Sequence, residues 1–538
     1  MKAARQILIY DSTLRDGSQA EDVSFSLEDK LGIAKKLDDL GFHYIEGGFP
    51  GSNPKDEAFF REVKKLKLKN IKVAAFGSTH SPKFTPAKDP NLKLLVECGA
   101  PVVTIVGKSW DLHVTDVLKV SRDVNLELIA GSIRYLKSRV KEVMFDAEHF
   151  FDGYRSNPDY AVKTLKAALD AGADWVILCD TNGGFLPHDV GDIVADVISK
   201  VDGKVGIHCH NDTDTAVANT IAAVRAGALQ VHGTMNGIGE RCGNVNLCSV
   251  VPALQLKAGY DCISPSNMKK MREASLYVYE MANMRHRIHQ PYVGDSAFAH
   301  KGGLHVDAVL KNSKTYEHIA PEMVGNSRRI LISDLAGKGS ILAKAREYGI
   351  DIESGDPVAK SIVANIKELE NQGFLFEGAD GSLEILMKKA KGEWEKKFDV
   401  LRARTIVSIS SDQMTPFSEA VIMVRTPDGE VHHAVAEGNG PVNAMDRAIR
   451  KALTDYYPEL RNIRLLDFKV RILDETSGSK AKTRVLIESG DDSGGKWGTV
   501  GVSENIIEAS WQALLDSIDY LLHKKGSKGA RKGGRKKR

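Results

Sequence analysis

Eight short apolar segments alternate with helix-length amphipathic segments over the first 260 residues of this 538-residue chain. The apolar segments contain ILIYD, YIEGGF, VAAFGS, VVTIVGKS, VMFDAEHF, WVILCDTNGG, VGIHCHND and LQVHGTMNG. Between the first two, apolar residues recur at helical spacing over residues 27–40. Strands that alternate with helices pair in parallel, and eight such units predict a closed (β/α)8 TIM barrel. An open doubly wound sheet is the alternative, because it needs only a different strand order.

Polar side chains gather at the carboxyl ends of these predicted strands. They are Asp11, Arg15, Asp16, Glu46, Ser78, Lys108, Glu148, Asp180, Thr181, His208, His210 and Asn236. The active sites of (β/α)8 barrels lie on this face. The distribution therefore favours the barrel and places a candidate active site at its C-terminal mouth.

The chain divides further after the predicted barrel of residues 1–260. Residues 261–397 are mainly helical, and we expect accessory subdomains that end in a charged helical linker, KKAKGEWEKK. Residues 398–525 twice repeat strands followed by a helix, which predicts a C-terminal α+β domain of two similar halves. Residues 526–538 contain seven Lys or Arg and no acid. We predict that they form a disordered solubilising tail, with weak contact to RNA as the alternative.

Composition excludes several classes of protein. No apolar run approaches the roughly 20 residues of a membrane span, and the N-terminus lacks the features of a signal peptide, so we expect a cytoplasmic protein with no membrane partner. The six cysteines include no CxxC pair, which argues against a disulfide framework and a structural zinc site. The net charge falls from +3 to −4 when the seven basic tail residues are left out. Since the tail lacks aromatic residues that could stack on bases, we expect no specific nucleic-acid partner.

Two histidines lie two residues apart in the seventh predicted strand. His208 and His210 therefore point to the same face, and Asp16 follows the first strand, two positions away in a closed barrel. Two imidazoles and an acid fit a divalent metal with nitrogen and oxygen ligands, whereas surface or core histidines are the alternative. Cys209 points the other way, and we interpret it as a packed thiol.

The loop NGIGERCGN follows the eighth predicted strand. Its glycines suggest a nucleotide loop, but no acid follows at the spacing of a dinucleotide site. We instead expect the loop to pack against the site and to offer Asn244 as an amide oxygen ligand. Glu148, at the end of the fifth strand, is either a solvated acid or a base, and its position alone leaves both open.

Five motifs follow one another along the chain. DSTLRDGSQ, HCHND and NGIGERCGN lie in the predicted barrel, GGLHVDAVLK lies beyond it, and EGNGPVNA lies in the C-terminal domain. Together they resemble the 2-isopropylmalate, homocitrate and citramalate synthase family over nearly the whole chain. Within that family, IEGGFPGSNPKDEAFF and TYEHIAPEMVGN are most similar to the long citramalate synthases.

The resemblance implies an acyltransferase. Its reaction would be a Claisen-type condensation of acetyl-CoA with a 2-keto acid, followed by hydrolysis of the thioester. Pyruvate is the expected keto acid, and 2-ketoisovalerate is the alternative. A metal-dependent lyase that cleaves a hydroxyacyl-CoA is a further alternative.

The resemblance also implies the roles of individual residues. It implies a divalent metal, which could be Mg²⁺, Mn²⁺, Co²⁺ or Zn²⁺. The ligands of this metal would be Asp16, His208, His210 and Asn244. The catalytic residues would be Arg15, Glu148 and His305, and the substrate-binding residues Gln19, Thr181 and Asp307. Arg15 would donate hydrogen bonds to the keto oxygen as it becomes an alkoxide, and Glu148 would help to deprotonate the acetyl methyl group. His305 and Asp307 would reach the site from the accessory region, often that of the other subunit of a homodimer.

The chain departs from the family pattern at two places. Family members commonly have DTVG where this chain has DTNG, so Asn182 alters the expected keto acid pocket. Some members have a tyrosine after the glycine that corresponds to Gly325, whereas Asn326 follows it here.

The C-terminal domain resembles the regulatory domain of the family, which binds an end-product amino acid at a dimer interface. The glycines of EGNGPVNAMDRAI precede a predicted helix, where free N–H groups favour a carboxylate. An ordinary glycine turn is the alternative. We expect isoleucine as the effector, or leucine if the substrate is 2-ketoisovalerate.

Overall fold

The chain forms two units. The computed structural model describes residues 5–410, 413–474, 478 and 480–530. One unit comprises residues 1–298 and 318–328, and the other comprises residues 299–317 and 329–538. The end of the predicted barrel domain at residue 260 therefore falls inside the first unit. The end of the predicted accessory region at residue 397 falls inside the second.

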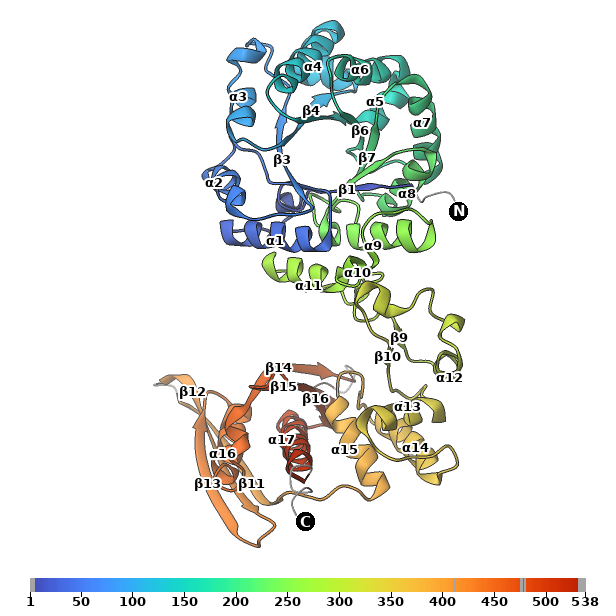
Figure 1. Ribbon diagram of the computed structural model, residues 1–538. Coiled ribbons are helices and arrows are strands. Elements are labelled where there is room, and N and C mark those ends of the chain that lie inside the picture. Colours follow the sequence, from blue (N-terminus) through green and yellow to red (C-terminus); the bar gives the residue numbers. More distant parts are fainter. Residues whose placement is uncertain (1–4, 411–412, 475–477, 479, 531–538) are drawn as a thin grey trace, which may run out of the picture. The chain divides into compact units, whose positions relative to one another are not determined.

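Eight parallel strands close into a barrel in the first unit (Figure 1). They are β1 (Leu8–Asp11), β2 (Tyr44–Glu46), β3 (Lys72–Ser78), β4 (Val102–Lys108), β5 (Glu142–Glu148), β6 (Trp175–Asp180), β7 (Val205–Cys209) and β8 (Gln230–Gly233). Each strand pairs with the next, and β1 also pairs with β8, where Tyr10 lies opposite His232. The closed order confirms the predicted (β/α)8 barrel and excludes the open sheet.

Helices surround this barrel, and several of them start at a side-chain cap. They are α1 (Leu27–Leu40), α2 (Pro54–Glu62), α3 (Pro90–Glu97), α4 (Arg122–Lys137), α5 (Phe150–Ser156), α6 (Pro158–Asp170), α7 (Pro187–Lys200) and α8 (Ala216–Ala226), followed by α9 (Leu247–Pro252), α10 (Pro265–Met268) and α11 (Met271–Met281). Ser26 and Asp29 form a capping box at the start of α1, and Gly41 ends the helix at φ +82°.

Alternate strand residues supply two separate cores. One set packs against the helices and includes Ile9, Ile45 and Val103. The neighbouring positions form a smaller cluster that includes Tyr10, Tyr44 and further residues of the strands, Ala74, Val102, Met144, Trp175, Ile177 and Cys179. Since successive strand residues point to opposite faces, this second cluster fills the barrel interior and forms the floor beneath its C-terminal mouth.

The second unit contains helices followed by two small sheets (Figure 1). Its first elements are β9 (Ala299–His300), α12 (Gly303–Lys311), β10 (Arg329–Ile330), α13 (Lys338–Tyr348), α14 (Pro357–Asn371) and α15 (Asp380–Lys391). Then come β11 (Asp399–Ser410), β12 (Gln413–Arg425), β13 (Val431–Gly438), α16 (Pro441–Leu453), β14 (Ile463–Ile472), β15 (Thr483–Asp491), β16 (Lys496–Ser503) and α17 (Ile506–Ala530). Each three-stranded antiparallel sheet is followed by a helix, as the predicted pseudo-repeat requires.

One local prediction is corrected in this unit. The linker KKAKGEWEKK was expected to be helical throughout, but α15 ends at Lys391 because Gly392 adopts φ +76° and closes the helix. The basic tail from Gly526 was expected to be disordered. Helix α17 is described to Ala530 and residues 531–538 lie outside the described residues, so the disordered tail stays a prediction. None of the helices in the described chain is long and apolar enough to cross a membrane.

Removal of residues 526–538 is expected to leave turnover unchanged. The buried residues of α17 include Ala509, Ala513, Ile518 and Leu522, all of which precede the cut. Comparison of kcat and KM between the full and the shortened chain checks this. A large loss of activity in the shortened chain would show that the basic segment has a role in the reaction.

A buried ion pair fixes the loop after β2. The Lys30 ammonium, whose residue is 2 % exposed, pairs with Asp56 and donates to the carbonyl oxygen of Gly47 at 3.1 Å. Asp56 also accepts from the backbone N–H of Phe49 at 3.0 Å. Burial lowers the pKa of Lys30. The pair therefore ties α1 and α2 to the loop that leaves β2 beside the barrel mouth.

Replacing Lys30 by methionine is expected to lower the free energy of unfolding by about 3–5 kcal/mol, because the Asp56 carboxylate would be left buried without its cation. Urea denaturation followed by circular dichroism measures this. Lys65→Met is the matched control, since Lys65 is exposed and pairs with Glu62 on the surface; it should change the same quantity by less than about 0.5 kcal/mol. Equal stabilities of the two variants would contradict the expectation.

Candidate active site

Three side chains converge at the C-terminal mouth of the barrel. Asp16 lies in the loop after β1, His208 lies near the end of β7, and His210 follows that strand directly. The Nε2 atoms of His208 and His210 lie 3.4 Å and 4.0 Å from Oδ2 of Asp16. The three residues are 2 %, 5 % and 6 % exposed, and one possible ligand atom from each lies within 4.8 Å of the others. Cys209 lies between the histidines but faces the outer core and is fully buried, as a packed thiol should be.

Asn244 completes this group from the loop after β8. Its backbone forms a bridge with that of His210, and its Nδ2 donates to Oδ2 of Asp16 at 2.8 Å. Its Oδ1 is buried and has no hydrogen-bond partner among the described residues. A side chain at Gly239 would lie 1.9 Å from this oxygen, so only glycine leaves room for it. One carboxylate, two imidazoles and an unpartnered amide oxygen are donors that fit a divalent cation.

Two members of this group are held in forms that bind a cation, whereas for a third, His208, the hydrogen bond to Asp16 outweighs burial and raises the pKa. Burial alone would raise the pKa of Asp16, but the Arg15 guanidinium and the His208 imidazole outweigh it and hold that pKa well below its usual range. Burial, helped by neighbouring His208, lowers the pKa of His210 to about 4. Asp16 is thus ionised and His210 is neutral near pH 7, and both are forms that bind metals.

Arg15 is held by a buried network. Its Nε donates to Oε2 of Glu46 at 2.7 Å, its Nη1 lies 3.3 Å from Oδ1 of Asp16, and its guanidinium carbon lies 3.9 Å from the ring centre of Phe76. Glu46 is fully buried and also accepts hydrogen bonds from the hydroxyls of Tyr10 and Ser12 at 2.8 Å and 2.7 Å. This network fixes the plane of the guanidinium at the mouth. Sequence reasoning noted Glu46 at a strand end but gave it no role, and it missed Tyr10 and Ser12.

The remaining barrel residues lie on the same face. Glu148, at the end of β5, forms an ion pair with Lys108 at the end of β4. Thr181 follows β6, and its Oγ1 accepts from the backbone N–H of His149 at 2.9 Å. Gln19 ends a short 3-10 helix after β1 and is exposed. Lys108 was noted in the sequence without a role, and its pairing with Glu148 follows from the register of adjacent strands.

His305 and Asp307 belong to the second unit, so they are not among the residues that the barrel brings together. Both are exposed on α12. The ring of His305 lies 4.3 Å from that of Tyr316, measured between ring centres, and Asp307 pairs with Lys311 at 2.6 Å.

Three family models match successive parts of the chain. The HMGL-like family matches residues 6–278, which contain the barrel. The homocitrate synthase post-HMGL domain-like family matches residues 292–373, and the LeuA allosteric (dimerisation) domain matches residues 377–522.

Individual relatives match nearly the whole chain. An (R)-citramalate synthase from Geobacter sulfurreducens is 56% identical over 518 residues, which cover 96% of this chain and 98% of that protein. One from Aquifex aeolicus is 55% identical over 527 residues, with 98% and 99% covered. A probable 2-isopropylmalate synthase from Methanopyrus kandleri is 33% identical over 520 residues, with 97% and 99% covered. The chain is therefore an enzyme, an acyltransferase of the citramalate synthase type, and belongs to the 2-isopropylmalate, homocitrate and citramalate synthase family.

Proposed function

We propose that this enzyme condenses acetyl-CoA with pyruvate and hydrolyses the thioester, giving citramalate and CoA. The observation that carries the proposal is the convergence of Asp16, His208, His210 and Asn244 beside Arg15 in a chain more than half identical to (R)-citramalate synthases. A divalent cation bound by the first four residues would polarise the keto carbonyl group.

The residues of the chain then have separate tasks. Thr181 binds the carboxylate of the keto acid, and the Glu148 carboxylate, oriented by Lys108, accepts a proton from the acetyl methyl group. The resulting carbon nucleophile attacks the keto carbon, and Arg15 donates hydrogen bonds to the oxygen that gains negative charge. That oxygen is protonated, and water then cleaves the thioester to release the carboxylate and the CoA thiol.

Two other reactions compete with this proposal. Condensation with 2-ketoisovalerate would use the same residues, but the 2-isopropylmalate synthase relative is only 33% identical, against 55–56% for the two citramalate synthases. A hydroxyacyl-CoA lyase would need no allosteric domain, whereas residues 377–522 match one. Both observations favour the condensation with pyruvate.

Thiol release from acetyl-CoA tests the substrate. Parallel assays with pyruvate, 2-ketobutyrate, 2-ketoisovalerate and 2-ketoglutarate, each with a divalent metal, should give the highest kcat/KM with pyruvate. A clear preference for 2-ketoisovalerate would show that the enzyme forms 2-isopropylmalate instead of citramalate. An absence of thiol release with all four keto acids would instead favour the lyase.

We further propose a homodimer with feedback inhibition by isoleucine, which places the enzyme in isoleucine biosynthesis. The match of residues 377–522 to an allosteric (dimerisation) domain supports the dimer. So do apolar side chains that both C-terminal sheets leave exposed, among them Leu401, Val407, Phe417, Val435, Leu465, Leu466, Val470 and Ile472. Titration of isoleucine and leucine in the thiol assay tests the inhibition. A rate that does not change with the concentration of either amino acid would contradict the proposed feedback inhibition.

A further inference from the structure

Two imidazoles lie side by side in the segments that follow β4 and β5, and the steps proposed above do not use them. The ring centres of His113 and His149 are 4.3 Å apart, and that of Trp110 lies 5.3 Å from His113 and 5.8 Å from His149. Helix α5 can approach this group because a Cβ at Gly153 would lie only 2.5 Å from the carbonyl oxygen of Ser109. Close packing of α5 on the loop after β4 therefore holds the two histidines together.

His149 lies between two residues of the proposed reaction. It directly follows Glu148 at the end of β5, and its backbone N–H donates to Oγ1 of Thr181 at 2.9 Å. Its backbone has φ +53° and ψ +35°, the left-handed region that few residues other than glycine adopt. Residues held in this region often belong to functional sites. His149 is thus fixed beside the acid assigned to the acetyl methyl group and the threonine assigned to the keto acid.

A carboxylate and an amide stand behind the His149 ring. Nδ1 of His149 lies 3.5 Å from Oδ2 of Asp152 on α5, and that oxygen accepts from Nδ2 of Asn182 at 3.1 Å. Asn182 is the residue that departs from the DTVG pattern of the family, and Asp152 is its partner. Nδ1 is enclosed, whereas Nε2 of His149 stays accessible and forms no hydrogen bond with the described residues. With its proton on Nδ1, facing Asp152, the neutral ring presents Nε2 as a proton acceptor.

The second imidazole lacks this arrangement. In the described part of the chain, no carboxylate makes such a contact with His113, which stacks on Trp110 instead. Burial, together with the charges of His149 and Lys108, lowers the pKa of His113, so its ring is neutral near pH 7. Of the two histidines, His149 is therefore the one that has both an orienting carboxylate and an accessible nitrogen.

The proposed reaction contains a step that has no assigned base. After the new carbon–carbon bond has formed, water must attack the thioester carbonyl carbon, and a base that removes a proton from the water speeds this attack. A Glu148 carboxyl that holds the proton of the acetyl methyl group cannot accept a second one. The methyl carbon is bonded directly to the thioester carbonyl carbon, so the water must attack next to Glu148, where His149 is the following residue.

We propose that His149 is the general base of thioester hydrolysis, a role that rests on the condensation proposed above. Nε2 takes a proton from water while the water oxygen bonds to the thioester carbonyl carbon. The carbon–sulfur bond then breaks, and the imidazolium gives its proton to the departing sulfur, which forms the CoA thiol. The carboxylic acid product loses its own proton to solvent. Asp152 and Asn182 are positioning residues, because they fix the orientation of the ring through Nδ1.

Hydrolysis can be measured apart from condensation with prepared citramalyl-CoA, the thioester that acetyl-CoA and pyruvate would give. We expect His149→Asn to lower thiol release from this thioester about a hundredfold to ten-thousandfold, the usual contribution of a general base. In a rapid-quench experiment with acetyl-CoA and pyruvate, the variant should form citramalyl-CoA as fast as the unaltered enzyme and then accumulate it. Asparagine tolerates the left-handed backbone and keeps the N–H that binds Thr181, so the variant should fold.

Two further variants complete the test. Asp152→Asn keeps an oxygen acceptor for Asn182 but removes the charge behind the ring. It should lower hydrolysis roughly ten- to hundredfold, as expected for loss of a hydrogen bond to a charged group, and leave condensation unchanged. His188→Asn, on the exposed surface of α7, is the matched control and should change neither rate.

Three results would overturn the proposal. One is equal hydrolysis of citramalyl-CoA by His149→Asn and by the unaltered enzyme, which would refute the role of His149 alone. A second is an equal slowing of condensation and hydrolysis in His149→Asn, which would show that the residue acts on the site as a whole. The third is an unaltered enzyme that neither forms nor hydrolyses citramalyl-CoA, which would refute the proposed function and the role of His149 with it.

Discussion

Replacement of His208 by alanine should lower kcat/KM in the thiol assay at least about a thousandfold, which corresponds to about 4 kcal/mol of transition-state stabilisation. The imidazole lies 3.4 Å from Asp16 and is nearly fully buried, so solvent does not replace it easily as a donor. The purified variant should also contain far less divalent metal by mass spectrometry than the unaltered enzyme. Titration with Mg²⁺, Mn²⁺, Co²⁺ and Zn²⁺ then shows which metal restores the unaltered enzyme after chelation.

His188→Ala is the matched control for this experiment. The His188 side chain is 72% exposed on α7, lies next to Asp189 and is not one of the clustered residues Asp16, His208 and His210. Its removal should change neither metal content nor turnover. Normal metal content and turnover in the His208 variant would refute the assignment of a metal to this cluster.

Replacement of Arg15 by lysine should lower kcat roughly a hundredfold while leaving metal content unchanged. Lysine keeps the positive charge that Glu46 and Asp16 require, so the buried carboxylates stay compensated. A single ammonium cannot, however, contact both carboxylates and also reach the keto oxygen as the planar guanidinium does. Loss of one donor to a developing oxyanion costs about 3 kcal/mol, or a hundredfold in rate.

The separation of kcat from metal content distinguishes the roles of Arg15 and His208. Arg155→Lys, at an exposed cation that pairs with Asp189 and stacks on Phe185, is the control and should retain full activity. A Tm close to that of the unaltered enzyme would show that Arg15→Lys folds normally. Full activity of the Arg15→Lys variant would contradict the proposal that Arg15 stabilises the oxyanion.

Periodicity predicted the barrel, because eight repeats of strand and helix leave few ways to bury both faces of a parallel sheet. The closeness of Asp16 to His208 could be anticipated from the same pattern, since ring closure brings the first and seventh strands near each other. The network around Glu46 could not be anticipated from the sequence. It depends on the rotamers that Tyr10, Ser12 and Arg15 adopt beside Glu46 of β2. Local pattern alone does not specify such contacts.

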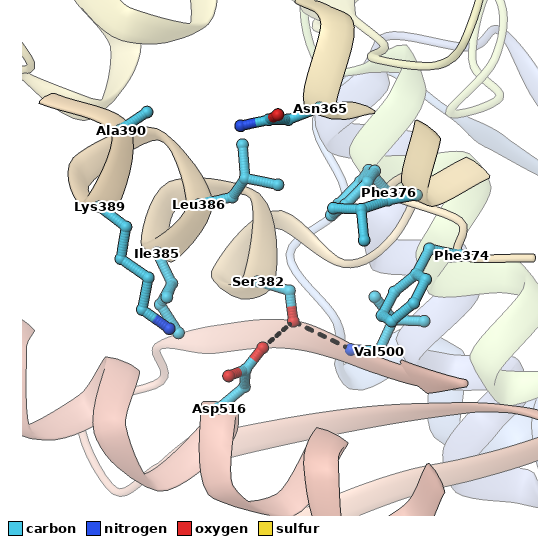
Figure 2. Close-up of a pocket in the computed structure, with 11 residues that line it drawn as sticks. Asn365, Phe374, Phe376, Ser382, Ile385, Leu386, Lys389, Ala390, Val500 and Asp516 are labelled. Atoms are coloured by element: carbon cyan, nitrogen blue, oxygen red, sulfur yellow. Dashed lines mark hydrogen bonds between the residues drawn. The ribbon is translucent and has the colours of Figure 1, made fainter. Parts of the chain in front are cut away.

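The incorrect helical prediction in the second unit has a local cause. KKAKGEWEKK has the charge pattern of a helix, but its glycine, Gly392, is a C-cap that ends the helix at Lys391. A cavity of about 440 Å³ in this unit could not be anticipated, because Asn365 on α14, Val500 on β16 and Asp516 on α17 line it together although they are far apart in the sequence (Figure 2). Only the packing of distant segments creates that space.

The position of the candidate active site across the seam between β1 and β8 has a consequence for biosynthesis. Asp16 and Arg15 leave the ribosome long before His208, His210 and Asn244 have been synthesised. The proposed ligand cluster therefore cannot assemble until β8 has been made and has paired with β1, a contact between distant parts of the chain that forms slowly. Binding of a metal to this cluster would thus report completion of the ring, and a nascent chain halted before β8 would lack the complete cluster.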